Sequence, residues 1–251
     1  MSHDIWHNVN RTRASFQRQA ISIVRKALKA YYAPITLVLK KGELPTKDQI
    51  DGLDKAIIRQ MFIDVHFMVG SKFATSIFKS FMKRTQTFAE DVYMSNVLNE
   101  IDTRGATMVS NIDVASKAII RRVIAEETAR GEGIPQIALE VSKSVNSINF
   151  KRGIRIARTE VIRASNSGAM TGANMTGLAL NKEWISTLDS RIRTNANGST
   201  FDHRRADGET VDKDAMFVKT GQALEYPVDW NGSAANIIQC RCTLGFKRKL
   251  A

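Results

Sequence analysis

Apolar residues recur at intervals of three and four through the first half of the chain, which is the pattern of helices with one buried side. Residues 8–41 carry one such stripe and predict a long helix that Pro34 ends or kinks near Tyr32 and Ala33. Residues 46–88 carry a wider stripe rich in Phe and Met, for which Thr46 is a suitable N-cap. We interpret this wider stripe as a bundle core; an adaptable surface for a partner protein is the alternative.

Three more helical patterns follow, separated by glycines, over residues 89–104, 106–130 and 134–147. The sequence therefore predicts an all-helical region over residues 1–147. This region has no glycine-rich phosphate loop, no histidine cluster and no paired carboxylates. His66 lies within the apolar set of its helix, so we interpret it as a core histidine. We expect no catalytic site in this region.

The helical pattern continues over residues 148–177, but one side of this helix carries mainly small residues. Small side chains allow another backbone to approach closely, so we expect this side to pack tightly against a sheet. The small residues are Ala164, Ser165, Ser167, Gly168, Ala169, Gly172 and Ala173.

Beyond Gly177 the pattern changes to short runs with the β-branched and aromatic content of strands. The predicted strands are residues 182–188, 209–211 and 236–246, and Asp-Gly and Asn-Gly pairs mark turns between them. The prediction is an α+β fold with two parts. A helical arm or bundle spans residues 1–147, and a small domain at 148–251 packs a helix on a short antiparallel sheet.

The two cysteines of the chain, Cys240 and Cys242, fall in the last predicted strand. Residues two apart on a strand share a face, so both thiols are expected to point the same way and Arg241 the opposite way. Cysteines one residue apart match the geometry of a disulfide poorly. They are therefore expected to be free thiols or metal ligands.

His203 would complete a set of three zinc ligands with the two cysteines if it reached the same face. Asp189 is the first candidate for a fourth ligand, with Asp202 and Asp207 as the others. The spacing differs from that of common zinc fingers, which use two cysteines three residues apart. Two interpretations remain open: a zinc site, or a packed cluster of thiols and imidazole without metal.

Basic residues are concentrated at both ends of the chain, whose formal charge is +12. Residues 1–41 contain eight Lys and Arg against one acidic residue, and residues 151–251 contain sixteen against ten. Such a distribution favours a nucleic acid or another acidic surface as partner; a solvated basic face is the alternative. The predicted nucleic-acid contacts are Arg11, Arg13, Arg18 and Arg25.

No apolar run reaches the length of a membrane span, and the N-terminus lacks the pattern of a signal peptide. We therefore expect a protein made in a reducing cytoplasm, with no membrane partner.

A series of features in the last third of the chain resembles a known domain. In order they are Ala157-Arg-Thr-Glu160, Trp184, Asp189-x-Arg-x-Arg193, His203, Asp207-Gly208, Phe217, Tyr226-Pro227 and Cys240-Arg-Cys242. This order resembles the Mu F-like domain of tailed-phage minor head, or head morphogenesis, proteins over residues 150–246. The chain departs from that pattern in the longer loop from Thr194 to Asp202 and in Gln239, where the family commonly has Asn.

The resemblance implies a structural minor head protein without enzymatic activity. Such a protein would act in head assembly, portal association and genome packaging or delivery, with the portal, other head proteins and non-specifically bound phage DNA as partners. It would reside in the virion, in the head interior or portal region, and in the host cytoplasm during assembly. The alternatives are a metal-dependent nuclease using His203 with Asp189 or Asp207, and a free DNA-binding protein. The first lacks a second catalytic histidine, and the second lacks a recognisable reading helix.

Overall fold

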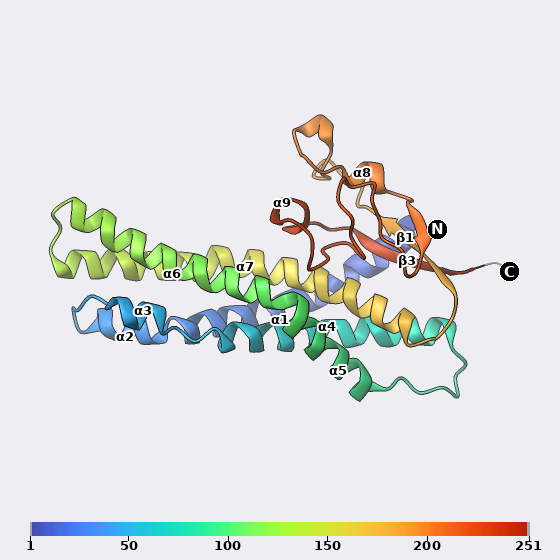
Figure 1. The fold of residues 1–251 in the computed structure, drawn as a ribbon, viewed down its shortest axis with the longest axis horizontal. Coiled ribbons are helices and arrows are strands. Elements are labelled where there is room, and N and C mark those ends of the chain that lie inside the picture. The colour runs from blue at the N-terminus through green and yellow to red at the C-terminus, as the bar shows by residue number, and fades with distance from the viewer. Residues whose placement is uncertain (1, 250–251) are drawn as a thin grey trace.

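Long helices run side by side along an elongated molecule, and a small sheet lies at one end of them (Figure 1). The structure, a computed structural model, describes residues 2–249. The N-terminus of the first helix lies at the sheet end. The helices of this part are α1 (Ser2–Tyr31), α2 (Ala33–Lys40), α3 (Lys47–Asp51), α4 (Ala56–Phe81), α5 (Glu90–Glu100), α6 (Ala106–Ala129) and α7 (Ile134–Asn174).

The helix boundaries follow local signals in the sequence. The first helix ends at Tyr31, and Pro34 occupies the first turn of α2, where its missing N–H costs no hydrogen bond. Thr46 caps α3 and forms a capping box with Gln49. A π-helical turn, Ile101–Gly105, joins α5 to α6.

The longest helix, α7, runs without interruption for 41 residues. The helical patterns predicted at 134–147 and 148–177 are therefore one helix, and the predicted boundary between residues 147 and 148 falls inside it. The helix belongs to both parts of the molecule, because its first half lies in the helical arm and its second half reaches the sheet (Figure 1).

The small-residue side of α7 packs against α4, not against a sheet as the sequence suggested. A Cβ atom added at Gly168 would lie less than 3.0 Å from the backbone of Gly70, and one at Gly172 would lie as close to the backbone of Ala74. The two helix backbones thus approach so closely that only glycine fits on α7 at these positions. Small residues indicate close approach correctly, but they do not indicate which element approaches.

The sheet has three antiparallel strands in the order β2-β1-β3, which confirms the predicted α+β fold. Lys182 in the central strand lies opposite Val211 on one side and Phe246 on the other. Two short α-helices and a 3-10 turn, Asn195–Asn197, interrupt the loops of this domain. The elements are β1 (Leu180–Ile185), α8 (His203–Ala206), β2 (Thr210–Asp212), α9 (Ala234–Ile237) and β3 (Thr243–Arg248).

The last strand begins at Thr243, so the prediction of a strand over residues 236–246 is wrong in its first half. Helix α9 occupies the start of that segment, and Gln239 adopts a left-handed conformation with φ 60° that turns the chain. The guanidinium of Arg193 donates hydrogen bonds to the carbonyls of Asn236 and Ile238 at the end of α9. These polar contacts override the strand tendency of the sequence.

Within residues 2–249, none of the helices combines the length and the apolar content that a membrane span requires. This finding agrees with the absence of long apolar runs in the sequence.

Candidate metal centre

His203, Cys240 and Cys242 come together in the interior of the C-terminal domain. The Nδ1 atom of His203 lies 3.4 Å from Sγ of Cys242 and 3.5 Å from Sγ of Cys240. All three residues are buried, and their ligand atoms lie within 4.8 Å of one another. We call these three residues the His-Cys-Cys cluster. Among the described residues, no other His, Cys, Asp or Glu joins this group.

The two cysteines reach this position by a different route from the predicted one. They lie in the irregular segment before β3 rather than on a strand, so a shared strand face does not align them. The backbone N–H of Cys242 instead points at Sγ of Cys240, 3.4 Å away, which curls the segment and brings both sulfur atoms to one side.

Short-range contacts hold His203 in place at the first residue of α8. Asp202 caps this helix by accepting a hydrogen bond from the backbone N–H of Arg205, at 2.9 Å. The backbone N–H of His203 donates to the carbonyl of Arg193, also at 2.9 Å. The ring meets that of Trp184 edge-on, with centroids 5.7 Å apart. The imidazole therefore has little freedom to turn away from the sulfur atoms.

The contact of the second ring nitrogen of His203 indicates the tautomer of the imidazole. Nε2 lies 2.7 Å from Oδ1 of Asn236, and the amide nitrogen of Asn236 donates to Oε1 of Gln222 at 3.1 Å. This donation orients the amide so that its oxygen accepts the Nε2 proton. Nδ1 is then available to bind a metal, which is the arrangement that metal-binding histidines use.

The surroundings of the two thiols shift their pKa values in opposite directions. Burial alone would raise the pKa of Cys240, but the hydrogen bond from Cys242 and the charge of His203 outweigh burial and lower this pKa well below its usual value. Burial and the neighbouring Cys240 together raise the pKa of Cys242 well above its usual value. For His203, burial lowers the pKa, but the contact with Cys240 outweighs it and raises the pKa. The contact with His203 thus makes Cys240 the more acidic of the two thiols, and a bound metal would require the ligand atoms to be free of protons.

Arg13 of α1 is buried against the cluster, which overturns its prediction as a nucleic-acid contact. Its guanidinium donates to Oγ of Ser165 at 2.6 Å, to Oδ1 of Asn166 at 2.8 Å and to the carbonyl of Cys242 at 3.3 Å. Burial lowers its pKa to about 10, although the two thiols act in the opposite direction. A side chain that is 4 % exposed and saturated with such partners cannot also reach a nucleic acid.

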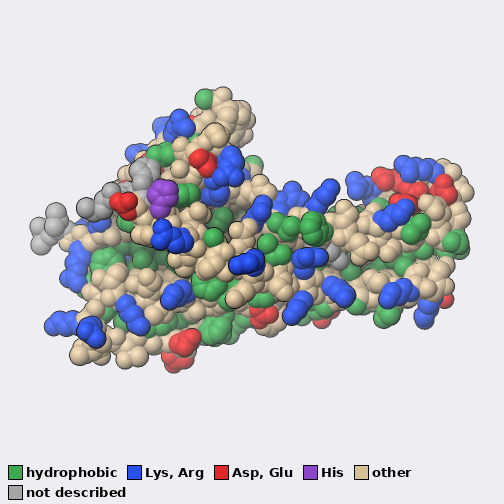
Figure 2. Space-filling view, turned by 180° about the vertical axis from the view of Figure 1, so that it is seen from behind, with side chains coloured by type: hydrophobic (Ala, Val, Ile, Leu, Met, Phe, Trp, Pro, Cys, Tyr) green, Lys and Arg blue, Asp and Glu red, His purple; other side chains and the backbone are tan. Residues whose placement is uncertain are grey.

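The other three predicted contacts, Arg11, Arg18 and Arg25, are exposed on α1. The guanidinium of Arg25 lies over the ring of Phe150, 5.1 Å from its centroid. Figure 2 shows lysines and arginines distributed along both the C-terminal domain and the helical arm on one face of the molecule.

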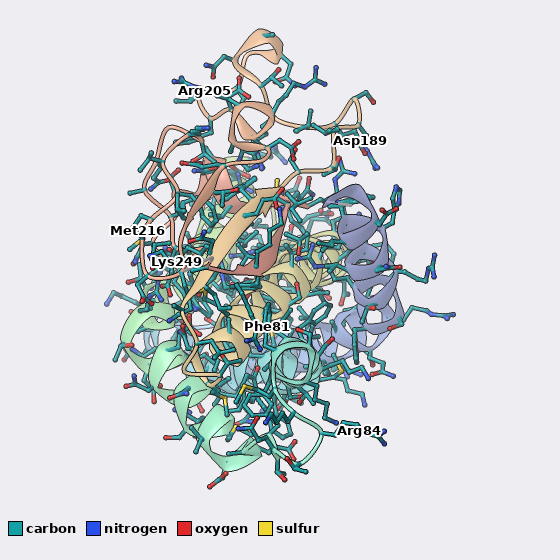
Figure 3. The ribbon with its side chains drawn as sticks, turned by 90° about the vertical axis from the view of Figure 1, so that its right-hand side faces the viewer. Phe81, Arg84, Asp189, Arg205, Met216 and Lys249 are labelled. Carbon is teal, nitrogen blue, oxygen red and sulfur yellow. The ribbon has the colours of Figure 1, made fainter. Side chains whose placement is uncertain are left out.

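The predicted carboxylate partners of the cluster are engaged elsewhere. Asp189 forms a bidentate ion pair with Arg241, at 2.5 and 2.6 Å, on the loop labelled in Figure 3. The hydrogen bond from Arg241 is the main reason that the pKa of Asp189 lies well below its usual value. Asp207 accepts hydrogen bonds from the backbone and hydroxyl of Ser186, and Asp202 caps α8. None of the three lies with the ligand atoms of the His-Cys-Cys cluster.

A cavity of about 470 Å³ opens beside the cluster, and all three cluster residues contribute to its lining. Its walls come from α1, α7, the loop after β1, the start of α8 and residues 239–242. Five arginines line it, whereas none of its lining residues is acidic. These arginines are Arg13, Arg158, Arg191, Arg193 and Arg241.

Sequence reasoning missed the roles of Arg13 and Asn236. For Arg13 the sequence does contain a signal, because the residue is in phase with the buried stripe of its helix, three residues before Phe16 and seven before Ala20. Arg11 and Arg18 fall outside that phase. For Asn236 no pattern in the sequence indicates the role, since its contact with His203 depends on the tertiary fold.

A family model of phage Mu protein F-like proteins matches residues 118–245, which is 128 of the 251 residues. The match covers the second half of α6, all of α7, and the C-terminal domain into β3, including the His-Cys-Cys cluster. No curated protein and no solved structure gives a significant match to the chain.

Proposed function

The chain belongs to the phage Mu protein F-like family, and we propose that it is a structural head protein of a tailed phage that acts in head morphogenesis. The observation that carries this proposal is the extent of the family match, which includes α7 and nearly all of the C-terminal domain that packs on it. The protein works as an assembly component of the virion rather than as an enzyme.

The helical arm is the part that contacts the portal or other head proteins. Leu37, Ile134 and Leu139 are large apolar residues that are 62 %, 52 % and 48 % exposed. They belong to α2 and to the start of α7, at the end of the molecule opposite the sheet (Figure 1). Exposed apolar side chains of this size are suited to protein–protein contact.

The test is to locate the chain in purified heads by asymmetric cryo-electron microscopy. Density at the portal or on the inner shell is the expected result, with the apolar end of the arm against the partner. Heads that assemble fully and contain none of the chain would contradict a structural role.

Contact with DNA is non-specific and electrostatic, and it uses exposed arginines of α1. Each neutralised phosphate contributes about −0.9 to the slope of log affinity against log salt. Replacing Arg11, Arg18 and Arg25 with Gln should therefore make the slope less negative for any duplex sequence. A variant with Lys40 and Lys41 replaced by Gln, at the opposite end of the arm, is the control and should keep the slope. Binding that does not respond to salt would assign the basic face to a protein partner.

The His-Cys-Cys cluster binds zinc, which joins α8 to the segment before β3. A tetrahedral zinc ion bound to nitrogen at about 2.0 Å and sulfur at about 2.3 Å separates these atoms by about 3.5 Å. The nitrogen–sulfur distances of 3.4 and 3.5 Å match that separation. The hydrogen bond from Nε2 to Asn236 is the outer contact expected of a metal-binding histidine. Elemental analysis should find about one zinc per chain, and a Cys240→Ser, Cys242→Ser variant should lose it.

A metal-dependent nuclease is the alternative function for a protein with a metal at this site. The two carboxylates predicted to take part in nuclease chemistry have other partners. Asp189 accepts hydrogen bonds from Arg241, and Asp207 accepts them from Ser186. Incubation of supercoiled plasmid with the protein and Mg²⁺, Mn²⁺ or Zn²⁺ should therefore give no nicked product. Nicking that is abolished by His203→Ala would make the protein an enzyme and overturn the structural assignment.

A further inference from the structure

We propose that the arginine-lined cavity beside the His-Cys-Cys cluster is a binding site for a phosphate group. The inference stands apart from the role in the phage head, because it rests on the lining of the cavity and is measured on the isolated protein.

The cavity gathers cations from four separate segments of the chain. Arg13 comes from α1, Arg158 from α7, Arg191 and Arg193 from the loop after β1, and Arg241 from the segment before β3. Like charges repel, so converging five guanidinium groups on one space costs free energy in the absence of an anion. A bound anion would offset that cost.

Nearby negative charge neutralises only part of the positive charge of the five arginines. Asp189 pairs with both Arg241 and Arg191, so one carboxylate serves two of the arginines. Arg193 and Arg13 donate to carbonyls and other uncharged groups. The cavity therefore keeps a positive field.

Arg158 provides the donor that is still free. Its side chain is exposed at the cavity, and it has no polar partner among the described residues. Arg191 is similarly available, because its side chain is 75 % exposed and makes a single ion pair through Nη2. These two residues line the cavity from different elements, one from α7 and one from the loop after β1.

Phosphate is the anion that this arrangement fits best. Guanidinium groups bind phosphate oxygens through pairs of parallel hydrogen bonds, and phosphate has enough oxygens to engage donors from several walls at once. The volume of about 470 Å³ exceeds that of a phosphate ion and lies in the range of pockets that bind small molecules. The phosphate can thus belong to free phosphate, to a nucleotide or to the backbone of DNA.

The test compares two double variants that remove the same charge. Arg158→Gln with Arg191→Gln alters the cavity, whereas Arg155→Gln with Arg205→Gln alters exposed residues of α7 and α8 that do not line it. Affinity for inorganic phosphate is measured by isothermal titration calorimetry at low salt. The cavity variant should bind at least about tenfold more weakly than the wild type, since each charge-assisted hydrogen bond contributes roughly that factor. The control should bind like the wild type.

A second titration with a short DNA duplex identifies the source of the phosphate. If the cavity variant loses affinity for both ligands and the control for neither, the cavity takes a phosphate of the DNA backbone. If it loses affinity for inorganic phosphate alone, the cavity takes a free phosphate or a nucleotide. Equal affinities of the two double variants, or no phosphate binding by the wild type at low salt, would overturn the proposal. Thermal melting of both variants verifies that they fold. The proposed role in the phage head is tested independently, by locating the chain in purified heads.

Discussion

The helical arm and the C-terminal domain are held together by different kinds of contact. In the arm, long helices bury apolar side chains along continuous stripes, and α7 meets α4 backbone to backbone at Gly168 and Gly172. In the C-terminal domain the strands have six residues at most, and buried polar side chains link the loops. The nitrogen of Lys182, for example, is buried and donates to the carbonyl of Glu225 at 2.8 Å.

The second half of α7 explains how the smaller part remains ordered. The side chain of Asn166 donates to the carbonyls of Pro227 and Cys242, at 2.8 and 3.2 Å, and Arg163 donates to the carbonyl of Val228 at 3.0 Å. The C-terminal domain thus folds against a helix that the arm already stabilises. Apolar packing tolerates exchange of similar side chains, whereas a buried polar network fails when one member is lost.

Removal of metal should have the largest effect, and it acts on the C-terminal domain. With zinc at about a thousandfold above its dissociation constant, binding adds about 4 kcal/mol to the free energy of unfolding. A chelator should therefore lower the melting temperature by about 10 °C. The measurement is differential scanning calorimetry with and without chelator.

The Cys240→Ser, Cys242→Ser variant is the control, because its melting temperature should not respond to the chelator. Asn236→Ala should keep the fold but weaken zinc binding by about 10- to 100-fold, since it removes the acceptor that orients His203. A wild type that ignores the chelator would identify the cluster as packed thiols and imidazole, for which Cys→Ser costs about 1–3 kcal/mol.

The closest approach in the helical arm should be nearly as sensitive. Gly168→Ala places a methyl group against the backbone of Gly70, which cannot move without separating α4 from α7. We expect a loss of about 3 kcal/mol in the free energy of unfolding, the upper end of the cost of overpacking.

Gly153→Ala on the same helix is the matched control for this change. The added Cβ would lie 3.4 Å from Cγ of Arg25, an ordinary contact, so the variant should gain about 0.5–1 kcal/mol from helix propensity. Both values come from urea denaturation. Equal effects of the two substitutions would show that the α4–α7 contact is looser than the structure has it.

Substitution of Arg13 tests the contact between α1 and the C-terminal domain. Arg13→Leu leaves Ser165, Asn166 and Thr243 without their buried donor and should cost about 2 kcal/mol. Arg11→Leu, two residues earlier and exposed, should change stability by less than about 0.5 kcal/mol. Urea denaturation measures both. A cost for Arg13→Leu no larger than for Arg11→Leu would mean that α1 does not anchor the C-terminal domain.

The difference between the helical arm and the C-terminal domain also explains which elements could be predicted from the sequence. In the arm, periodicity located most of the helices because burial there depends on a repeating apolar pattern, and Pro34 and Thr46 marked helix boundaries correctly. The segment predicted to be helical at 46–88 is instead two helices, α3 and α4, and the second ends at Phe81. In the C-terminal domain, strands at 180–185 and 210–212 were close to the predicted ranges, but α8 and α9 were missed. These short helices depend on caps and on contacts such as that of Arg193, which no local period encodes.

For the candidate site, residue type proved more informative than geometry. His203, Cys240 and Cys242 were selected because their side chains are metal ligands, and the structure brings them together. The reason given, a common strand face, was wrong, and Asp189 does not join them. The role of Asn236 and the convergence of the cavity arginines could not be predicted, because they depend on the assembly of segments far apart in the sequence.

The smallest expected effect comes from comparing one surface ion pair in each part. Asp189 with Arg241 and Asp102 with Arg59 are both bidentate, and the carboxylate side chains are 36 % and 50 % exposed. In each case the arginine holds the pKa of the carboxyl below its usual value of 3.8. A lowered folded-state pKa stabilises the protein above that usual value, and the contribution is lost as the pH falls from that value through the folded-state pKa. Asp189→Asn should thus cost about 0.5 kcal/mol at pH 7, after allowance for solvent screening, and less at pH 3. Asp102→Asn should cost less at pH 7, because Asp102 is the more exposed of the two carboxylates. Urea denaturation at both pH values measures the four differences. A cost for Asp189→Asn that does not fall at all between pH 7 and pH 3 would mean that its shape rather than its charge supports the segment before β3.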